Sequence, residues 1–135
     1  MKRIVLTLAL FIPLLMQAQM GFEVKEIVVD TSFDETTGDP VAKGKVCNTG
    51  NDTIYLYWRI EDNMVPLGWT PYFCDKNLCY GPGTVECPEE EPVILAPGEC
   101  GVMDLHLLAG ANPECGKFDL VIWERGNESN NVTMT

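Results

Sequence analysis

Cysteine is the residue type with the clearest chemical potential in this sequence. Six cysteines occur among 135 residues, at Cys47, Cys74, Cys79, Cys87, Cys100 and Cys115. An even number of cysteines in a small exported chain indicates a disulfide framework. Cys74 and Cys79 are separated by four residues, which is not the Cys-x-x-Cys spacing of redox enzymes. The sequence therefore predicts a structural Cys74–Cys79 bond that closes one short loop.

Histidine is the other residue type that often performs chemistry, and His106 is the single example. Ser-His-Asp triads and Cys-His dyads need a nucleophile within reach of a positioned base. His106 shares a strand face with Asp104, but the local pattern offers no nucleophile beside them. Zinc sites of the Cys/His kind need reduced thiols, whereas thiols of an exported protein are expected to be oxidised. We therefore expect a surface histidine, no catalytic residue, no metal ion and no cofactor.

Acidic residues gather in two clusters that could hold a cation. The clusters are Asp34, Glu35 and Asp39, and Glu86, Glu89, Glu90 and Glu91. Neither cluster follows the spacing of a calcium-binding loop, so solvated loops are the favoured interpretation. The formal net charge of −11 argues against binding to nucleic acid or to anionic lipid surfaces. It fits either simple solubility or a cationic partner.

Aromatic residues surround the segment that Cys74 and Cys79 close. They are Trp69, Tyr72, Phe73 and Tyr80. Exposed aromatic side chains on a stapled loop could stack on a sugar ring or enter a protein interface. The alternative is a small satellite core that covers the loop.

The first 18 residues predict a cleaved signal peptide rather than part of the fold. Lys2 and Arg3 precede an almost unbroken apolar run over residues 4–16, and Ala18 is small enough for the cleavage position. The run is too short to span a membrane. We therefore expect a secreted, periplasmic or cell-surface protein whose mature domain covers residues 19–135.

Alternating side chains predict an all-β domain with no convincing helix. In the clearest strand, residues 53–60, the even-numbered side chains are apolar, whereas Tyr55, Tyr57 and Arg59 share the opposite face. Further strands are expected at residues 21–32, 41–48, 92–95, 100–108, 117–125 and 131–135, with a long connection over 61–80. About seven strands separated by turns predict an immunoglobulin-like antiparallel β-sandwich.

Several segments together resemble a known family. They are the Val-Cys-Asn-Thr-Gly-Asn-Asp-Thr run at 46–53, the Trp58 strand, the Leu-Gly-Trp run at 67–69, the Cys-Asp-Lys-Asn-Leu-Cys-Tyr run at 74–80 and the Leu-Ala-Pro-Gly-Glu turn at 95–99. The chain from Phe22 to Thr135 resembles secreted immunoglobulin-like modules of the Bacteroidota, which are often followed by a type IX secretion sorting domain. The resemblance implies no catalytic residues. No sorting domain follows Thr135, so the resemblance implies a stand-alone periplasmic or secreted domain, or a truncated one.

The resemblance also bears on modification of the chain. Asp52-Thr53-Ile54 resembles the O-glycosylation signal used by Bacteroidota. It implies Thr53 as the acceptor.

The remaining cysteines can be paired from sandwich geometry. Cys47 ends one strand and Cys100 begins another at the same end of one sheet, and both are on outward faces. Cys87 and Cys115 precede strands that start at the opposite end. We therefore predict Cys47–Cys100 and Cys87–Cys115 bonds. Trp58 is expected to be plain core, because the antibody pattern of Cys and Trp would need a further cysteine in the 117–125 strand.

These observations favour a non-catalytic secreted sandwich that binds a protein or a glycan through the 69–80 loop. The alternative is a purely structural or spacer domain with no ligand of its own.

Overall fold

The computed structural model describes residues 21–28, 40–64, 67–108 and 117–134. Within these residues the chain forms strands and no helix. The strands are β1 (Phe22–Val28), β2 (Val41–Asn48), β3 (Ile54–Met64), β4 (Thr70–Asp75), β5 (Val93–Leu95), β6 (Cys100–Leu108), β7 (Lys117–Glu124) and β8 (Asn131–Met134). The predicted signal peptide at 1–18, the acidic cluster at 34–39 and Cys115 lie outside the described residues.

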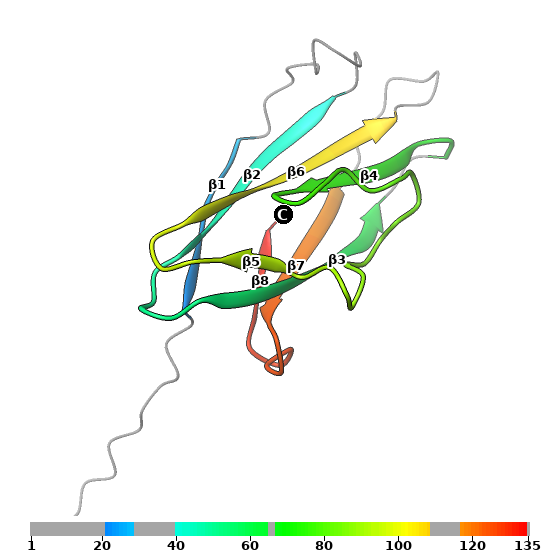
Figure 1. Ribbon diagram of the computed structural model, residues 1–135. Helices are drawn as coiled ribbons and strands as arrows, with labels where there is room; N and C mark the ends of the chain where they lie inside the picture. Colours follow the sequence, from blue (N-terminus) through cyan, green and yellow to red (C-terminus); the bar gives the residue numbers. More distant parts are fainter. Residues whose placement is uncertain (1–20, 29–39, 65–66, 109–116, 135) are drawn as a thin grey trace, which may run out of the picture.

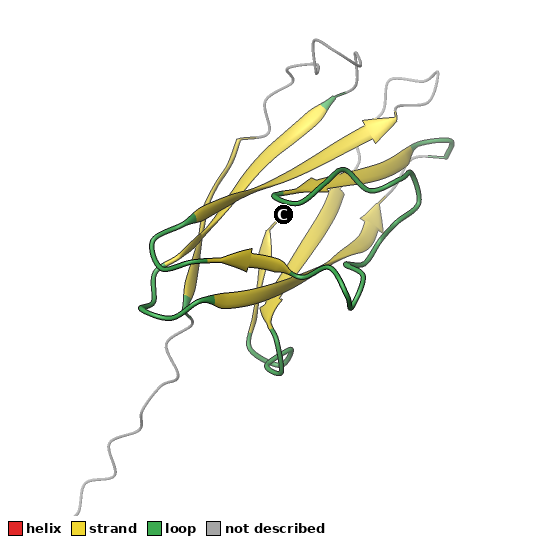
Figure 2. Ribbon diagram, viewed as in Figure 1, coloured by secondary structure: helices red, strands yellow, loops and turns green. Residues whose placement is uncertain are grey.

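Two antiparallel sheets face each other as layers (Figure 1, Figure 2). One sheet has the order β1-β2-β6-β4 and the other has the order β5-β3-β7-β8. Apart from the short β5, these orders match the ABED and CFG sheets of an immunoglobulin-type sandwich. The predicted antiparallel β-sandwich is therefore confirmed, with eight strands where about seven were expected.

The core lies between the sheets and takes alternate residues from each strand. Leu56 and Trp58 of β3 are completely buried, whereas Tyr55 on the opposite face is 37% exposed. Val46 of β2 and Phe73 of β4 reach the same core from the other sheet. The expectation that Trp58 is plain core is confirmed.

The expectation of one long connection over residues 61–80 is wrong. β3 continues to Met64, and Thr70–Asp75 forms β4. The sequence disguises β4 because Pro71 lacks the N–H group that a strand normally donates. β4 pairs with β6 and lies at the end of its sheet, where a proline is tolerated.

β2 and β6 pack closely enough with β8 to require a glycine. A Cβ atom on Gly44 would lie 2.5 Å from the carbonyl oxygen of Met103 and 2.6 Å from Cε of Met134. Real Cβ atoms do not approach backbone oxygens so closely, so any larger residue here would push β6 away from β2 within their sheet.

Candidate functional site

Two disulfide bonds hold the outer face of the β1-β2-β6-β4 sheet. Cys47 of β2 bonds to Cys100 of β6, directly opposite in the register, with Cα atoms 4.0 Å apart. Cys74 bonds to Cys79 across the turn that follows β4, with Cα atoms 3.9 Å apart. Both predicted pairings are present. Two disulfide bonds are consistent with a protein that lies outside the cytoplasm.

The predicted Cys87–Cys115 bond is not formed, because Cys87 is a free, buried thiol. Its backbone N–H donates to the carbonyl oxygen of Trp58 at 2.9 Å, so residue 87 runs beside the edge of β3. Its sulfur donates weak hydrogen bonds to the carbonyl oxygens of Pro88 and Glu91. The prediction placed Cys87 at the end of the sandwich. In the structure the backbone of residue 87 pairs with β3, and the Cys87 side chain points into the core. Burial, followed by the charge of Asp75, raises the pKa of the thiol to about 11, so it is neutral near pH 7.

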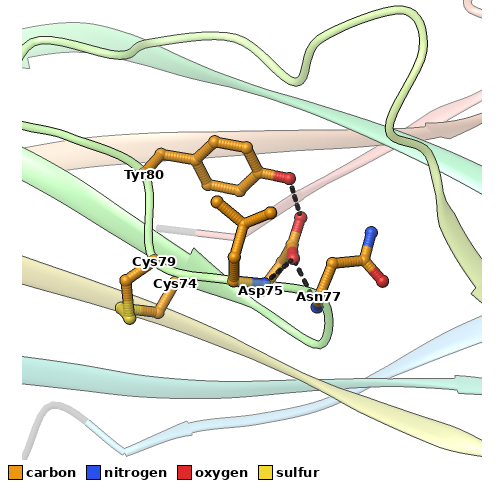
Figure 3. The surroundings of a disulfide bond; sticks show 6 residues. Cys74, Asp75, Asn77, Cys79 and Tyr80 are labelled. Carbon is orange, nitrogen blue, oxygen red and sulfur yellow. Dashed lines mark hydrogen bonds between the residues drawn. A yellow bond between two sulfur atoms is a disulfide. The ribbon is translucent and has the colours of Figure 1, made fainter.

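The stapled loop is organised by one buried carboxylate, that of Asp75 (Figure 3). Its Oδ2 accepts hydrogen bonds from Trp58 Nε1 and from the Tyr80 hydroxyl, both at 2.9 Å. Its Oδ1 accepts the backbone N–H groups of Asn77 at 2.7 Å and Leu78 at 3.3 Å. These bonds tie the turn after β4 to the central strand of the opposite sheet. Burial and the bond to Asp75 also raise the pKa of Tyr80 above its ordinary value.

The four aromatic residues predicted as a binding set do not share one environment. Phe73 has no exposed surface and Tyr80 is 6% exposed, and both rings pack against Trp58. They belong to the core, as the alternative of a core that covers the loop expects. Trp69 and Tyr72 are half-buried and keep some surface. The alternative interpretation, an aromatic core beneath the loop, therefore accounts for half of the set.

His106 is buried, which corrects the expectation of a surface histidine. It occupies the outward position that the alternation of β6 assigns to it. There the ring of its register partner Tyr72 stacks on the imidazole, with centroids 4.5 Å apart. No group of three or more potential metal ligands occurs among the described residues.

The outer face of the other sheet carries a ladder of rings and guanidinium groups that the sequence analysis did not single out. Tyr57 of β3 and Trp123 of β7 are register partners, with ring centroids 6.2 Å apart. Arg59 lies over Trp123 at 5.3 Å, and Arg125 lies over Tyr55 at 4.6 Å. Such cation–π contacts contribute about 0.5–1 kcal/mol each at exposed sites. The ladder covers Trp123, which is 8% exposed although it faces outward.

Hydrogen bonds lock the ladder to the loops on either side. The Tyr57 hydroxyl donates to the carbonyl oxygen of Glu89 at 3.1 Å and accepts from Arg125 Nε at 3.1 Å and Nη2 at 3.0 Å. Arg59 donates to Glu128 at 2.9 Å and to Glu61 at 3.0 Å. The bond to Glu128 and then the bond to Glu61 raise the pKa of Arg59, so its charge is permanent.

An open hollow of about 490 Å³ lies between these loops, and we call it the Tyr57 hollow. Its lining includes Tyr57, Trp123, Arg125, Glu86, Glu89 and Glu128. The backbone pairing of Glu86 with Arg59 places the 85–87 segment along the edge of β3. The hollow thus combines aromatic walls with three carboxylates and one guanidinium group, a combination suited to holding a polar ligand.

The sequence contains a partial signal for this site, in the alternation of side chains along two strands. It placed Tyr55, Tyr57 and Arg59 on one face of the 53–60 strand, and the same alternation in the 117–125 strand assigns Trp123 to one face of that strand. The alternation does not show that the two strands are neighbours in register. The acidic cluster Glu86, Glu89, Glu90 and Glu91 could not be connected with these two strands from the sequence, because only the fold brings that segment to the edge of β3.

The predicted acceptor Thr53 is exposed at the turn before β3, as is Asp52 beside it. Both residues are therefore accessible to a modifying enzyme.

The two sheets, their strand orders and the cross-strand disulfide bonds define a disulfide-stabilised antiparallel β-sandwich. The structure is similar to the N-terminal domain of PorA, with a TM-score of 0.55 and 15% sequence identity over 76% of this chain and 78% of that chain. At this identity the similarity concerns the fold alone. No family model and no curated protein match the chain. In the described part of the chain, no helix has the length and apolar character needed to cross a membrane.

Proposed function

We propose that the protein is an exported, non-catalytic β-sandwich module that binds a partner through the Tyr57 hollow. The single observation that carries this proposal is the hollow itself, where a ladder of interlocked rings and guanidinium groups meets carboxylates on two flanking loops. Rigid scaffolds that position such loops are common supports for binding sites. The resemblance to secreted modules of the Bacteroidota and the two disulfide bonds support export through the predicted signal peptide.

The stapled 69–80 loop is a weaker candidate for the same role. Its turn is held from within by Asp75, and two of its four aromatic side chains are committed to the core. Trp69 and Tyr72 still keep some surface, so this loop remains a second surface to test. The third possibility is a structural or spacer domain without any ligand.

Site-specific photo-crosslinking in the source cells distinguishes these possibilities. A benzophenone amino acid replaces Glu90 beside the Tyr57 hollow, Leu78 on the stapled loop, or Val102 on the outer face of the other sheet, all of which are exposed. We expect one discrete adduct that forms from position 90 and not from positions 78 or 102. An adduct from position 78 alone would transfer the binding role to the stapled loop. The absence of any adduct would favour the spacer interpretation.

A further inference from the structure

The charges around the Tyr57 hollow are unbalanced toward negative. Glu128 pairs with Arg59, and Arg125 is held by the Tyr57 hydroxyl. Glu86 and Glu89 are exposed and take part in no ion pair within the described residues. Cys87 adds no charge near pH 7, because its pKa is raised to about 11. Two carboxylates therefore remain available to a ligand at the edge of the hollow.

The aromatic walls, like the two carboxylates, favour a positively charged ligand. The faces of Tyr and Trp rings carry negative electrostatic potential and attract cations. On this sheet the attraction already holds two guanidinium groups, Arg59 over Trp123 and Arg125 over Tyr55 and Tyr57. Rings on this surface thus already hold organic cations of the protein's own chain.

Other classes of ligand fit the hollow less well. An anion would meet three carboxylates and a chain with a net charge of −11, while both nearby guanidinium groups are already engaged. A metal ion would need converging ligands, and no such group occurs among the described residues. A purely apolar ligand would leave the carboxylates without a counter-charge. A volume of about 490 Å³ is ample for one long side chain.

We propose that the Tyr57 hollow binds a lysine or arginine side chain presented by a basic segment of a protein partner. The ammonium or guanidinium group would lie between Glu86 and Glu89, and the methylene stem would pack on Tyr57. This inference rests on the proposed function, since it names the chemistry of the partner that the same hollow would bind.

The test uses two capped pentapeptides, Gly-Lys-Gly-Lys-Gly and its uncharged analogue with norleucine in place of lysine. Binding is followed by two-dimensional NMR of the ¹⁵N-labelled protein. We expect the lysine peptide to shift the amide signals of Tyr57 and Glu89 and the indole signal of Trp123. The norleucine peptide should leave these signals in place. Raising the salt concentration should weaken the binding, because exposed charges are screened.

Matched charge variants separate the hollow from general acidity. Glu86→Gln with Glu89→Gln should weaken binding of the lysine peptide by about fivefold, as expected for two exposed charge contacts. Glu90→Gln with Glu91→Gln removes the same charge from neighbouring side chains that do not line the hollow. This control should change the dissociation constant by less than about twofold. All four residues are exposed, so both variants should keep the fold, which circular dichroism verifies.

Equal binding of the norleucine peptide, equal weakening by both double variants, or no shift with the lysine peptide would each overturn the inference. Its failure is separable from failure of the proposed function. An adduct from position 90 together with no binding of the lysine peptide would leave the binding face in place and reject only the basic partner.

Discussion

At the scale of single residues, the buried carboxylate of Asp75 anchors several of the polar contacts that hold the core together. Its carboxylate accepts four hydrogen bonds, and two of the donors are the side chains of Trp58 and Tyr80. A buried donor that loses its acceptor costs about 1–3 kcal/mol. This one side chain therefore couples the β4 turn, the central strand and the aromatic core.

Replacing Asp75 with asparagine should destabilise the protein strongly. The amide would present N–H groups to one pair of donors, so we expect the free energy of unfolding to fall by about 2–3 kcal/mol. Tyr80→Phe removes one of the four bonds and should cost about 1 kcal/mol. Urea denaturation measures both, with Glu90→Gln as an exposed control that should stay within about 0.5 kcal/mol of the parent. An Asp75→Asn protein as stable as the control would contradict the role assigned to this carboxylate.

The Cys87 thiol should make the protein sensitive to alkali. Its pKa is raised from about 9 to about 11 in the fold, so between these values the folded state binds more protons than the unfolded state. The contribution to stability is complete below about pH 9 and is lost as the pH rises through 11. For a shift of this size the loss reaches up to about 2–3 kcal/mol.

Urea denaturation from about pH 7 to about pH 10.5 checks this dependence. Cys87→Ala should be less stable throughout, because it leaves a small cavity, but its stability should fall less steeply with pH. Tyr80 is present in both proteins, and its raised pKa gives both a further decline above pH 10. Parallel curves for the two proteins would rule out the thiol as the cause.

At the scale of elements, the two disulfide bonds differ in how much chain they close. Cys47–Cys100 joins residues 53 apart, whereas Cys74–Cys79 joins residues 5 apart. In the chain-entropy account, a disulfide bond stabilises the fold by removing conformational entropy from the unfolded chain. The entropy removed grows with the logarithm of the separation between the two cysteines. The longer loop should therefore contribute more to stability, although both bonds bridge directly opposed residues.

Paired alanine variants test this difference. We expect Cys47→Ala with Cys100→Ala to lower the free energy of unfolding by roughly 4 kcal/mol, and Cys74→Ala with Cys79→Ala by roughly 2 kcal/mol. Guanidinium denaturation measures both losses. A larger loss from removing Cys74–Cys79 than from removing Cys47–Cys100 would contradict the prediction. It would mean that the disulfide bond stabilises the β4 turn more than the hydrogen bonds of Asp75 do.

At the scale of the whole molecule, export is the property on which the other proposals depend. We predict that the mature protein begins at Gln19, because Ala18 is the small residue that ends the predicted signal peptide. N-terminal sequencing of protein recovered from the periplasm or the medium checks this start. Replacing Ala18 with a bulky residue such as tryptophan should leave the precursor uncut. Recovery of the full-length parent chain from the cytoplasm would contradict the prediction.

Alternation of side chains was sufficient to predict most of the fold. The 41–48 and 100–108 strands were predicted with their observed bounds, because their side chains alternate between the two faces of the sheet. β4 was missed, since an edge strand that contains Pro71 resembles a connection. The Cys74–Cys79 and Cys47–Cys100 bonds could be predicted from short spacing and from shared outward faces. Cys87 could not be placed, because its environment depends on the pairing of the 85–87 segment with β3.

The sequence by itself determined the fold class of the protein: a chain of alternating strands that cysteines stabilise. Only the tertiary structure decided where a ligand could bind. Periodicity is a local property, so it identifies the outward faces that carry Tyr57 and Trp123. The Tyr57 hollow depends on which strands are neighbours and on where Glu86 and Glu89 meet them. That arrangement follows from pairing between residues far apart in the chain, and no local pattern records it.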